Sequence, residues 1–505
     1  MNRLLIANRG EIALRIIRAC REHGVSPVAV YSDADRNAPY VALADSAFRL
    51  GPGPATESYL RMELLLEAAR TLGADAVHPG YGFLSENADF ADACAAAGLT
   101  FVGPSGPVIR ALGDKSTAKR RMGAAGVPVV PGYAGEDQSA ERLRAEAQSL
   151  GTPLLIKASA GGGGRGMRRV DDLAEFDALW DEARREATSA FGDGRVLLER
   201  YVLRPRHVEF QIFGDTHGNV VHLGERECSI QRRHQKILEE SPSPVLTPAV
   251  RARMAEAAVT VGRTAGYVGA GTVEFLLEER DGEEPAFYFL EVNTRLQVEH
   301  PVTESVTRQD LVRWQLRVAD GEPLPLTQEQ IEPAGHAIEV RIYAEDPATG
   351  FLPSVGTIAR WEPPAGPGIR VDSGYETGSV VPPFYDPMLA KLIASGATRS
   401  EAIDRLERAL CEFVVIGVRT NIPYLLAIVR DSAFRAGEMT TGFLAERFAG
   451  WKPAGGVPVE VLLALAAEAA LPAAPTPGGE TARRVRRTAP WETIDGWQNV
   501  KLRDE

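Results

Sequence analysis

With 505 residues, 44% of them hydrophobic and 25% charged, the chain has the composition of an ordinary globular enzyme and a length that suits about two to four domains. The net charge of -12 argues against a nucleic-acid-binding protein, and no apolar run approaches the length of a membrane-spanning helix. The four cysteines show neither metal-ligand spacing nor a disulfide framework, which favours the cytosol.

Strands and helices alternate along the first hundred residues. The pattern predicts strands over 4–7, 28–31, 74–77 and 100–103, and a helix follows the first strand. This alternation is typical of a doubly wound parallel sheet with helices on both faces. The first turn lacks the G-x-G-x-x-G pattern, so a dinucleotide-binding fold is only weakly supported. Ligands of such sheets bind beyond the carboxyl ends of the strands, where His78–Asn87 lies.

The pattern predicts helices over residues 104–127. A small module follows this helical segment. Its most distinctive segment is a glycine run, 161–166, after a strand that ends at Lys157. Glycine lets backbone N–H groups approach an anion closely, but the run lacks the order of a P-loop. The alternatives are a plain hairpin tip and a loop that covers phosphates. Lys157, with Arg165 inside the run, favours the phosphate-covering loop.

Charged residues are dense near the middle of the chain. The segment Gln231–Lys236 carries three fixed cations and one histidine in six residues. One interpretation is a solvated basic face, and another is an RNA-binding patch, although aromatic residues for base stacking are missing. A preceding strand that leads into Glu225-Arg226-Glu227 favours the floor of a binding site instead.

The segment Glu291–Pro301 packs two carboxylates, two amides, an arginine and a histidine into eleven residues. It follows an apolar strand, and a second strand over 272–277 is joined to that strand by a polar turn over 279–284. This hairpin is expected to bring Glu274 beside Glu291. Facing carboxylates repel each other, so the simplest prediction is a divalent cation between them, and Mg²⁺ suits oxygen ligands. The alternative is a solvated hairpin end.

A later strand, His336–Asp346, alternates apolar and polar residues. Glu339 and Arg341 therefore share one face of it. The pattern fits either a cross-strand ion pair or a functional pair.

Lysine is rare in this chain, because only seven of the 56 basic residues are lysines. The lysines that remain are expected where a compact ammonium on a flexible stem cannot be replaced by a planar guanidinium. Lys115, Lys157 and Lys236 all lie in motif-like segments.

Six segments in order resemble biotin carboxylase, of the ATP-grasp superfamily, over about residues 1–447. They are Ile6–Ala13, His78–Asn87, Gly113–Lys115, Ile156–Ser159 with its glycine run, Gln231–Lys236 and Glu291–Pro301. Ala160 and Val292 depart from the common residues without removing a functional group. The resemblance implies an α/β and α+β architecture with five parts. They are a doubly wound N-terminal domain (1–103), a helical linker (104–128), a small mobile ATP-grasp lid (129–203), a C-terminal ATP-grasp domain (204–447) and a Pro/Ala/Gly-rich linker and tail (448–505).

The resemblance also implies ATP-dependent carboxylation of biotin by bicarbonate through carboxyphosphate. It assigns ATP binding to Lys115, Lys157, Gly163, Gly164, Glu199, Val202, His207, His234 and Glu274, and Mg²⁺ or Mn²⁺ binding to Glu274, Glu291 and Asn293. Bicarbonate would be held by Lys236, Arg295, Gln297 and Val298, with Glu299 as its general base. Arg341 would stabilise the biotin enolate, and Tyr81 would shape the biotin pocket. A neighbouring arginine is expected to keep Glu299 ionised.

The family further implies partners: a biotin carboxyl carrier protein, carboxyltransferase subunits of an acyl-CoA carboxylase, such as that of fatty acid biosynthesis, and a second copy of the chain. No nucleic acid or membrane is expected. The segment Ala489–Trp497 is similar to the one that follows biotin carboxylase in the α chains of acyl-CoA carboxylases. The sequence contains no Met-Lys-Met biotinylation motif, so we expect a split or truncated system in which biotin arrives on another polypeptide. The alternatives are another ATP-grasp carboxylate ligase and a catalytically silent scaffold.

Overall fold

The N-terminal sheet is parallel and has five strands in the order β3-β2-β1-β4-β5, as the alternating pattern predicts. The computed structural model describes residues 1–159, 167–233, 235–280 and 282–453, and all structural statements concern these residues. The strands are β1 (Arg3–Ile6), β2 (Ser26–Ser32), β3 (Ser46–Gly51), β4 (Ala76–His78) and β5 (Thr100–Phe101). The helices are α1 (Gly10–His23), α2 (Pro39–Leu43), α3 (Met62–Leu72) and α4 (Ala88–Ala96).

The two faces of this sheet have separate cores, because successive side chains of a strand point to opposite sides. Leu4 and Ile6 of β1 pack in one cluster with Ile12 and Ile16 of α1. Leu5 packs in the other cluster, which includes residues of α3 and α4. The predicted doubly wound architecture is therefore confirmed. The sequence pattern missed β3, whose serine and arginine break the apolar run.

Two helices lead out of this sheet, α5 (Gly106–Gly113) and α6 (Lys115–Ala124). Asp114 separates them, and its carboxylate caps α6 by accepting a hydrogen bond of 2.7 Å from the Thr117 backbone N–H. Ala118 and Met122 anchor α6 in the core beneath the large sheet. The N-terminus of α6 thereby holds Lys115 at a fixed position.

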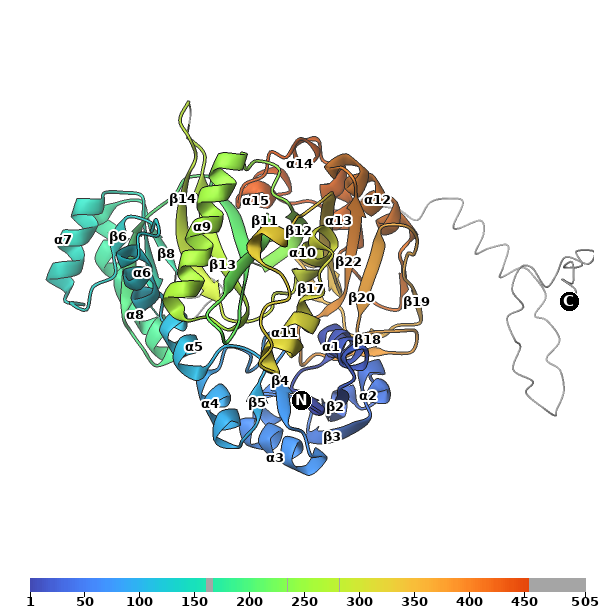
Figure 1. Cartoon of the computed structure of the whole chain (residues 1–505). Coiled ribbons are helices and arrows are strands. Elements are labelled where there is room, and N and C mark those ends of the chain that lie inside the picture. Colours follow the sequence, from blue (N-terminus) through green and yellow to red (C-terminus); the bar gives the residue numbers. More distant parts are fainter. Residues whose placement is uncertain (160–166, 234, 281, 454–505) are drawn as a thin grey trace, which may run out of the picture. The chain divides into compact units, whose positions relative to one another are not determined.

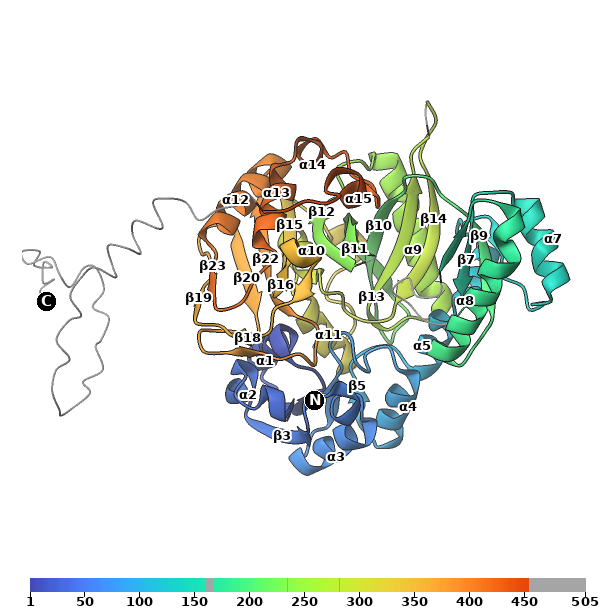
Figure 2. The ribbon, with the colours of Figure 1, turned by 180° about the vertical axis from the view of Figure 1, so that it is seen from behind.

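A small module follows, with a four-stranded sheet in the order β6-β9-β7-β8. Its elements are β6 (Gly132–Tyr133), α7 (Ala140–Leu150), β7 (Leu154–Ala158), β8 (Arg168–Val170), α8 (Phe176–Phe191) and β9 (Val196–Arg200). Leu143, Ile156 and Leu198 contribute to a core of its own. The module emerges beside β14, as a bridge between Val129 and Phe289 indicates, and both views show it at that edge (Figures 1 and 2).

The largest sheet is antiparallel and has eight strands in the order β14-β13-β10-β11-β12-β15-β22-β20. These are β10 (Arg206–Gly214), β11 (Val220–Arg232), β12 (Gln235–Ser241), β13 (Gly269–Glu278), β14 (Ala286–Asn293), β15 (His336–Tyr343), β20 (Ile369–Ser373) and β22 (Met388–Gly396). The helices around it are α9 (Pro248–Ala265), α10 (His300–Thr307), α11 (Leu311–Ala319), α12 (Arg399–Glu412), α13 (Ile422–Arg430), α14 (Ser432–Ala436) and α15 (Phe443–Arg447).

Opposite faces of β15 meet different helices. Ala337 packs against Val302 and Val306 of α10, while Ile338 and Val340 belong to the large core that includes α12 and α13. Polar side chains that share the α10 face, such as those of Glu339 and Arg341, are therefore enclosed between the sheet and this helix.

Short elements complete the fold. Three two-stranded pairs are β16 (Glu345–Asp346) with β17 (Leu352–Pro353), β18 (Gly356–Thr357) with β21 (Val380–Val381), and β19 (Arg360–Glu362) with β23 (Val414–Ile416). Single 3-10 turns cover Asp33–Asp35, Ala55–Glu57, Leu173–Glu175, Gln328–Gln330 and Pro347–Thr349. Within the described residues, no helix combines the length and the apolar character that crossing a membrane requires.

Candidate active site

Lys236 is the centre of a buried charge cluster on the large sheet. Its Nζ lies 2.5 Å from Glu209, 2.9 Å from Glu274 and 2.8 Å from Glu299. The antiparallel register sets Glu209 of β10 directly opposite Glu274 of β13, and β12 brings Lys236 to them. Burial lowers the pKa of Lys236, but the three carboxylates outweigh it and raise this pKa well above its usual range. Lys236 is thus a permanent cation.

Glu299 lies at the N-terminus of α10, and its side chain is fully buried. Its Oε1 accepts from Lys236, and its Oε2 accepts from Arg341 Nη2 at 2.9 Å. Burial raises the pKa of this carboxyl, but Lys236, Arg341 and Arg226 hold it well below its usual range. Glu299 is therefore an ionised carboxylate between two cations. The arginine expected beside Glu299 is Arg341.

Arg341 also forms the cross-strand ion pair that the alternation in its strand allowed. Its partner is Glu239 of β12, with Nε 2.7 Å from Oε1, and not Glu339 of its own strand. Arg341 therefore bridges Glu239 and Glu299, and its functional role stays a prediction.

The loop before α10 presents three further predicted residues. Arg295 Nη1 donates to Gln297 Oε1 at 3.0 Å and to the backbone carbonyl of Leu296 at 3.1 Å. The backbone carbonyl of Val298 accepts from Lys391 Nζ at 3.0 Å. Arg295 Nε also lies 3.3 Å from Glu86, which belongs to the polar loop after β4. The site therefore lies where that loop meets the large sheet.

Tyr81 comes from the same polar loop. Its backbone carbonyl accepts from Asn8 Nδ2 at 2.8 Å, which fixes the loop to the end of β1. Its ring lies 5.9 Å from Lys391 Nζ, and Lys391 contacts Val298. Tyr81 thus borders the Arg295–Glu299 loop through Lys391.

The predicted metal ligands lie on adjacent strands. Glu274 is directly opposite Glu291 in the β13–β14 ladder, as predicted, and Asn293 Nδ2 donates to Glu274 Oε1 at 2.8 Å. Glu291 accepts from Lys115 Nζ at 2.9 Å, and its side chain is one quarter exposed. Two carboxylates and an amide oxygen beside an opening to solvent fit a hard divalent cation that also binds substrate phosphates.

His207 extends this group. Its Nε2 lies 3.1 Å from Glu274, and its Nδ1 lies 2.6 Å from Gln231 Nε2. Burial lowers the pKa of His207, but Glu274 outweighs it and raises this pKa above its usual value. Ligand atoms of His207, Glu209 and Glu274 all lie within 4.8 Å of one another, but the Lys236 ammonium contacts both of these carboxylates.

The predicted nucleotide residues Lys157 and Glu199 are in direct contact, at 2.5 Å between Nζ and Oε2. Lys119 of α6 was not predicted as a site residue. Its Nζ lies 2.9 Å from the other carboxylate oxygen of Glu199, Oε1. Burial raises the pKa of Glu199, but the two lysines outweigh it and lower the pKa to about 2. Val202, two residues after β9, is also buried. This buried triad joins the small module to α6.

Three of the predicted residues, Gly163, Gly164 and His234, lie outside the described residues. Their placement therefore stays a prediction. The same holds for the tail segment Ala489–Trp497.

Two further residues of the site were not predicted from the sequence, because a single charged residue within a strand carries no distinctive signal. Arg226 has no exposed surface and donates to Glu209 at 2.6 Å and to Gln211 at 2.8 Å. Its own signal was the Glu225-Arg226-Glu227 segment, which predicted a site floor without predicting roles. Lys391, also fully buried, was given no role either.

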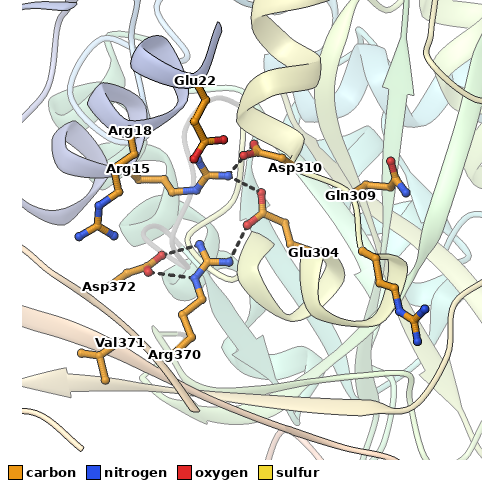
Figure 3. A pocket seen from close by; sticks show the side chains of 10 residues that line it. Arg15, Arg18, Glu22, Glu304, Gln309, Asp310, Arg370, Val371 and Asp372 are labelled. Carbon is orange, nitrogen blue, oxygen red and sulfur yellow. Dashed lines mark hydrogen bonds and ion pairs between the residues drawn. The ribbon is translucent and has the colours of Figure 1, made fainter. Parts of the chain in front are cut away.

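A pocket is lined by residues of α1, α10 and β20, among them Arg15, Glu304 and Arg370 (Figure 3). Arg370 bridges Glu304 and Asp372 at 2.8 Å each, and Arg15 bridges Glu304 and Asp310. Asp372 lies 3.9 Å from Lys391, so these ion pairs continue to the residue that holds Val298.

Comparison with known proteins identifies the chain. Family models match in succession: biotin carboxylase, N-terminal domain, over residues 1–109; carbamoyl-phosphate synthase L chain, ATP binding domain, over 114–327; and biotin carboxylase C-terminal domain over 339–446. Biotin carboxylase 1 of Bacillus subtilis (strain 168) is 50% identical over 444 residues, which cover 88% of this chain and 98% of that protein. The chain belongs to the biotin carboxylase family.

Longer biotin carboxylase relatives match over the same region. The mitochondrial methylcrotonoyl-CoA carboxylase subunit alpha of Oryza sativa subsp. japonica is 53% identical over 449 residues, which cover 89% of this chain. The chain spans about 60% of the length of that subunit.

Among solved structures, the chain is similar to the biotin carboxylase domain of Hydrogenobacter thermophilus 2-oxoglutarate carboxylase. The TM-score is 0.86 and the identity 46%, covering 90% of this chain and 99% of that domain. That structure is described as a dimer in complex with MgADP, ADP and bicarbonate.

Proposed function

We propose that the chain catalyses the ATP-dependent carboxylation of biotin with bicarbonate, as the first half-reaction of an acyl-CoA carboxylase. The observation that carries this proposal is Glu299, an ionised carboxylate fully buried between Lys236 and Arg341. A base in this position takes the proton of an anion that neighbouring cations hold. Bicarbonate is such a substrate, because it is a planar anion that carries an acidic proton.

In the first step, Glu299 accepts the O–H proton of bicarbonate while an oxygen of bicarbonate attacks the γ-phosphorus of ATP. The bond to the β-phosphate oxygen breaks, giving carboxyphosphate and ADP. Lys236, Arg295, Gln297 and the backbone of Val298 hold the bicarbonate. Phosphoryl transfer depends mainly on positioning and charge neutralisation. The cations Lys236 and Arg295 are therefore the chain's main contribution to the step.

Lys115 and Lys157 are the proposed ligands of the ATP phosphates, with Gly163 and Gly164 closing over them. Glu199, Val202, His207 and His234 complete the nucleotide site. Glu274, Glu291 and Asn293 would hold Mg²⁺ or Mn²⁺, which when bound neutralises phosphate charge.

In the second step, carboxyphosphate breaks down to CO2 and inorganic phosphate. The released phosphate takes the proton of the ureido N1′ of biotin, and N1′ forms a bond to the carbon of CO2. Negative charge develops on the ureido oxygen, and the Arg341 guanidinium stabilises it. Tyr81 shapes the biotin pocket from the N-terminal side.

We further propose a homodimer whose biotin comes on a biotin carboxyl carrier protein, with separate carboxyltransferase subunits. The homodimer is supported by the dimer of the similar 2-oxoglutarate carboxylase domain. The other partners are supported by the match to part of a longer carboxylase subunit. The division into 1–103, 104–128, 129–203, 204–447 and 448–505 is retained as a proposal. A cytoplasmic location is proposed as well, and because one relative is named mitochondrial, cell fractionation is its test.

The deciding experiment is bicarbonate-dependent ADP release by the purified chain with Mg²⁺, with and without free biotin. Stimulation by biotin that disappears in Glu299→Gln supports the proposal. Turnover indifferent to bicarbonate and biotin would favour another ATP-grasp ligase, and absence of turnover would favour a scaffold.

A further inference from the structure

Two buried carboxyl groups lie opposite each other beneath α10. Glu239 of β12 and Glu339 of β15 are direct partners in the antiparallel ladder, and neither has any exposed surface. Partners of this kind have Cβ atoms about 4.5–5.5 Å apart. Among the described residues, neither oxygen of Glu339 has a hydrogen-bond partner, and Oε2 of Glu239 has none either. Three acceptor atoms of one cross-strand pair therefore receive no hydrogen bond from the described residues.

These free atoms fit a single shared proton. Two ionised carboxylates in this position would repel each other, and a buried carboxylate without a donor is strongly disfavoured. If one carboxyl is protonated, its O–H donates to the free oxygen of the other, and the pair keeps one negative charge. Burial raises the pKa of Glu239 to about 7 and that of Glu339 well above its usual range, in agreement with a retained proton.

The charged groups around the pair come from four elements. Lys391 of β22 and Arg341 of β15 act on Glu339 as cations, and Lys236 of β12 acts in the same sense on Glu239. Glu299, at the start of α10, adds a negative charge near both. Neither lysine donates a hydrogen bond to Glu339. The cations thus lower the charge repulsion without satisfying the free oxygens.

The pair acts on the reaction through Arg341. This guanidinium is bonded to Glu239 at 2.6–2.7 Å and to Glu299 at 2.9 Å, so the charge of the pair decides how strongly Arg341 is held. Resting on the proposed function, we propose that Glu239 and Glu339 share one proton and are positioning residues that keep Arg341 available to the biotin enolate. When the proton is lost, a second negative charge holds Arg341 and competes with the charge that develops on biotin.

The test is the pH profile of Glu339→Gln, which is nearly isosteric with the protonated acid but does not ionise. For the parent we expect kcat/KM for biotin to fall by up to about tenfold per pH unit once the pair ionises, between about pH 7 and pH 9. Glu339→Gln should change by less than about twofold over this range, and the KM for ATP should be indifferent to pH in both proteins. An alkaline fall in kcat/KM for biotin that persists unchanged in Glu339→Gln would overturn the inference.

Glu240→Gln is the matched control. Glu240 is the next residue of β12, points to the other face and binds His336 and Arg399, without contact to Arg341. The kcat/KM of Glu240→Gln for biotin should keep the alkaline fall of the parent, and loss of that fall would contradict an effect specific to the Glu239–Glu339 pair.

Infrared difference spectroscopy of the parent against Glu339→Gln separates this inference from the proposed function. The parent should show the C=O stretch of a protonated carboxyl at neutral pH, and the variant should lack it. Absence of that band in the parent would refute the shared proton even if biotin is carboxylated. Presence of the band without biotin carboxylation would establish the shared proton and refute the role assigned to Arg341.

Discussion

Replacing Lys119 by methionine is expected to weaken ATP binding although Lys119 is not a predicted phosphate ligand. In this structure Glu199 is bound by Lys119 on one oxygen and by Lys157 on the other. Lys157 can turn to a phosphate at low cost only if Lys119 continues to neutralise the buried carboxylate. Without Lys119, moving Lys157 would leave Glu199 with an uncompensated charge.

The magnitude follows from the contact that is lost. A hydrogen bond to a charged group contributes about 1.5–3 kcal/mol, and Lys119 supplies one such bond at 2.9 Å in a buried setting. If that amount is added to the free energy of releasing Lys157, ATP affinity falls by roughly 10- to 150-fold. Biotin affinity should change by less than about twofold, because the triad is far from Arg341 in the chain's topology and shares no partner with it.

The assay is calorimetric binding of ATP and MgADP, together with KM for ATP and for biotin. Arg120→Met is the matched control, since Arg120 lies on the same helix and pairs at 2.6 Å with the exposed Glu136 and not with Glu199. Lys119→Arg should restore much of the affinity. Unchanged ATP affinity in Lys119→Met, or equal losses for ATP and biotin, would refute the reasoning.

Three other outcomes are expected. Glu299→Gln should lower bicarbonate-dependent ADP release by about 10²–10⁴-fold while nucleotide binding stays within about threefold, and comparable loss of both would contradict its role as a base. Arg341→Ala should reduce the rate of biotin carboxylation by about 10²-fold with little change in ATP affinity, and an equal decline in ATP affinity would count against it. As pH rises, the free energy of unfolding of Glu227→Gln should increase relative to that of the parent. Burial raises the pKa of Glu227 from 4.5 to about 7, so the parent loses free energy of unfolding between these values and the glutamine variant does not. Thermal unfolding that shows the same pH slope in both proteins would exclude this.

Strand pairing could be predicted from the sequence where the order of strands and helices, or a polar turn between two strands, determines which strands are neighbours. The predicted polar turn over 279–284 between two strand-like segments indicated a hairpin. The ladder sets Glu274 opposite Glu291 through a register shift between Glu274 and Phe275 that the pattern did not predict. The alternating strands and helices of residues 1–103 likewise predicted the parallel sheet. In both cases the determining contacts are local in sequence or follow from element order.

Contacts between charges far apart in the sequence could not be predicted in this way. Arg226 contacts Glu209, and Lys391 contacts Val298, only because strand order brings these residues together. For the buried lysines the available signal was the scarcity of lysine. Lys119 and Lys391 are among only seven lysines, and each is buried against a candidate site residue.

A common feature of the site is that its cations are already bound by carboxylates. Lys115 holds Glu291, Lys157 holds Glu199, and Arg341 holds Glu299. Each proposed substrate contact therefore requires an exchange of partners and not the capture of a free charge.

This exchange connects nucleotide and metal binding. When Lys115 turns from Glu291 to an ATP phosphate, it leaves a carboxylate that is one quarter exposed and lies opposite Glu274. Glu291, together with Glu274 and Asn293, would then be able to hold a divalent cation, which would supply the counter-charge that the lysine had provided. Because the proposed phosphate ligand Lys115 is paired with the proposed metal ligand Glu291, ATP and Mg²⁺ should favour each other's binding, by the reciprocity that links two ligands of one protein.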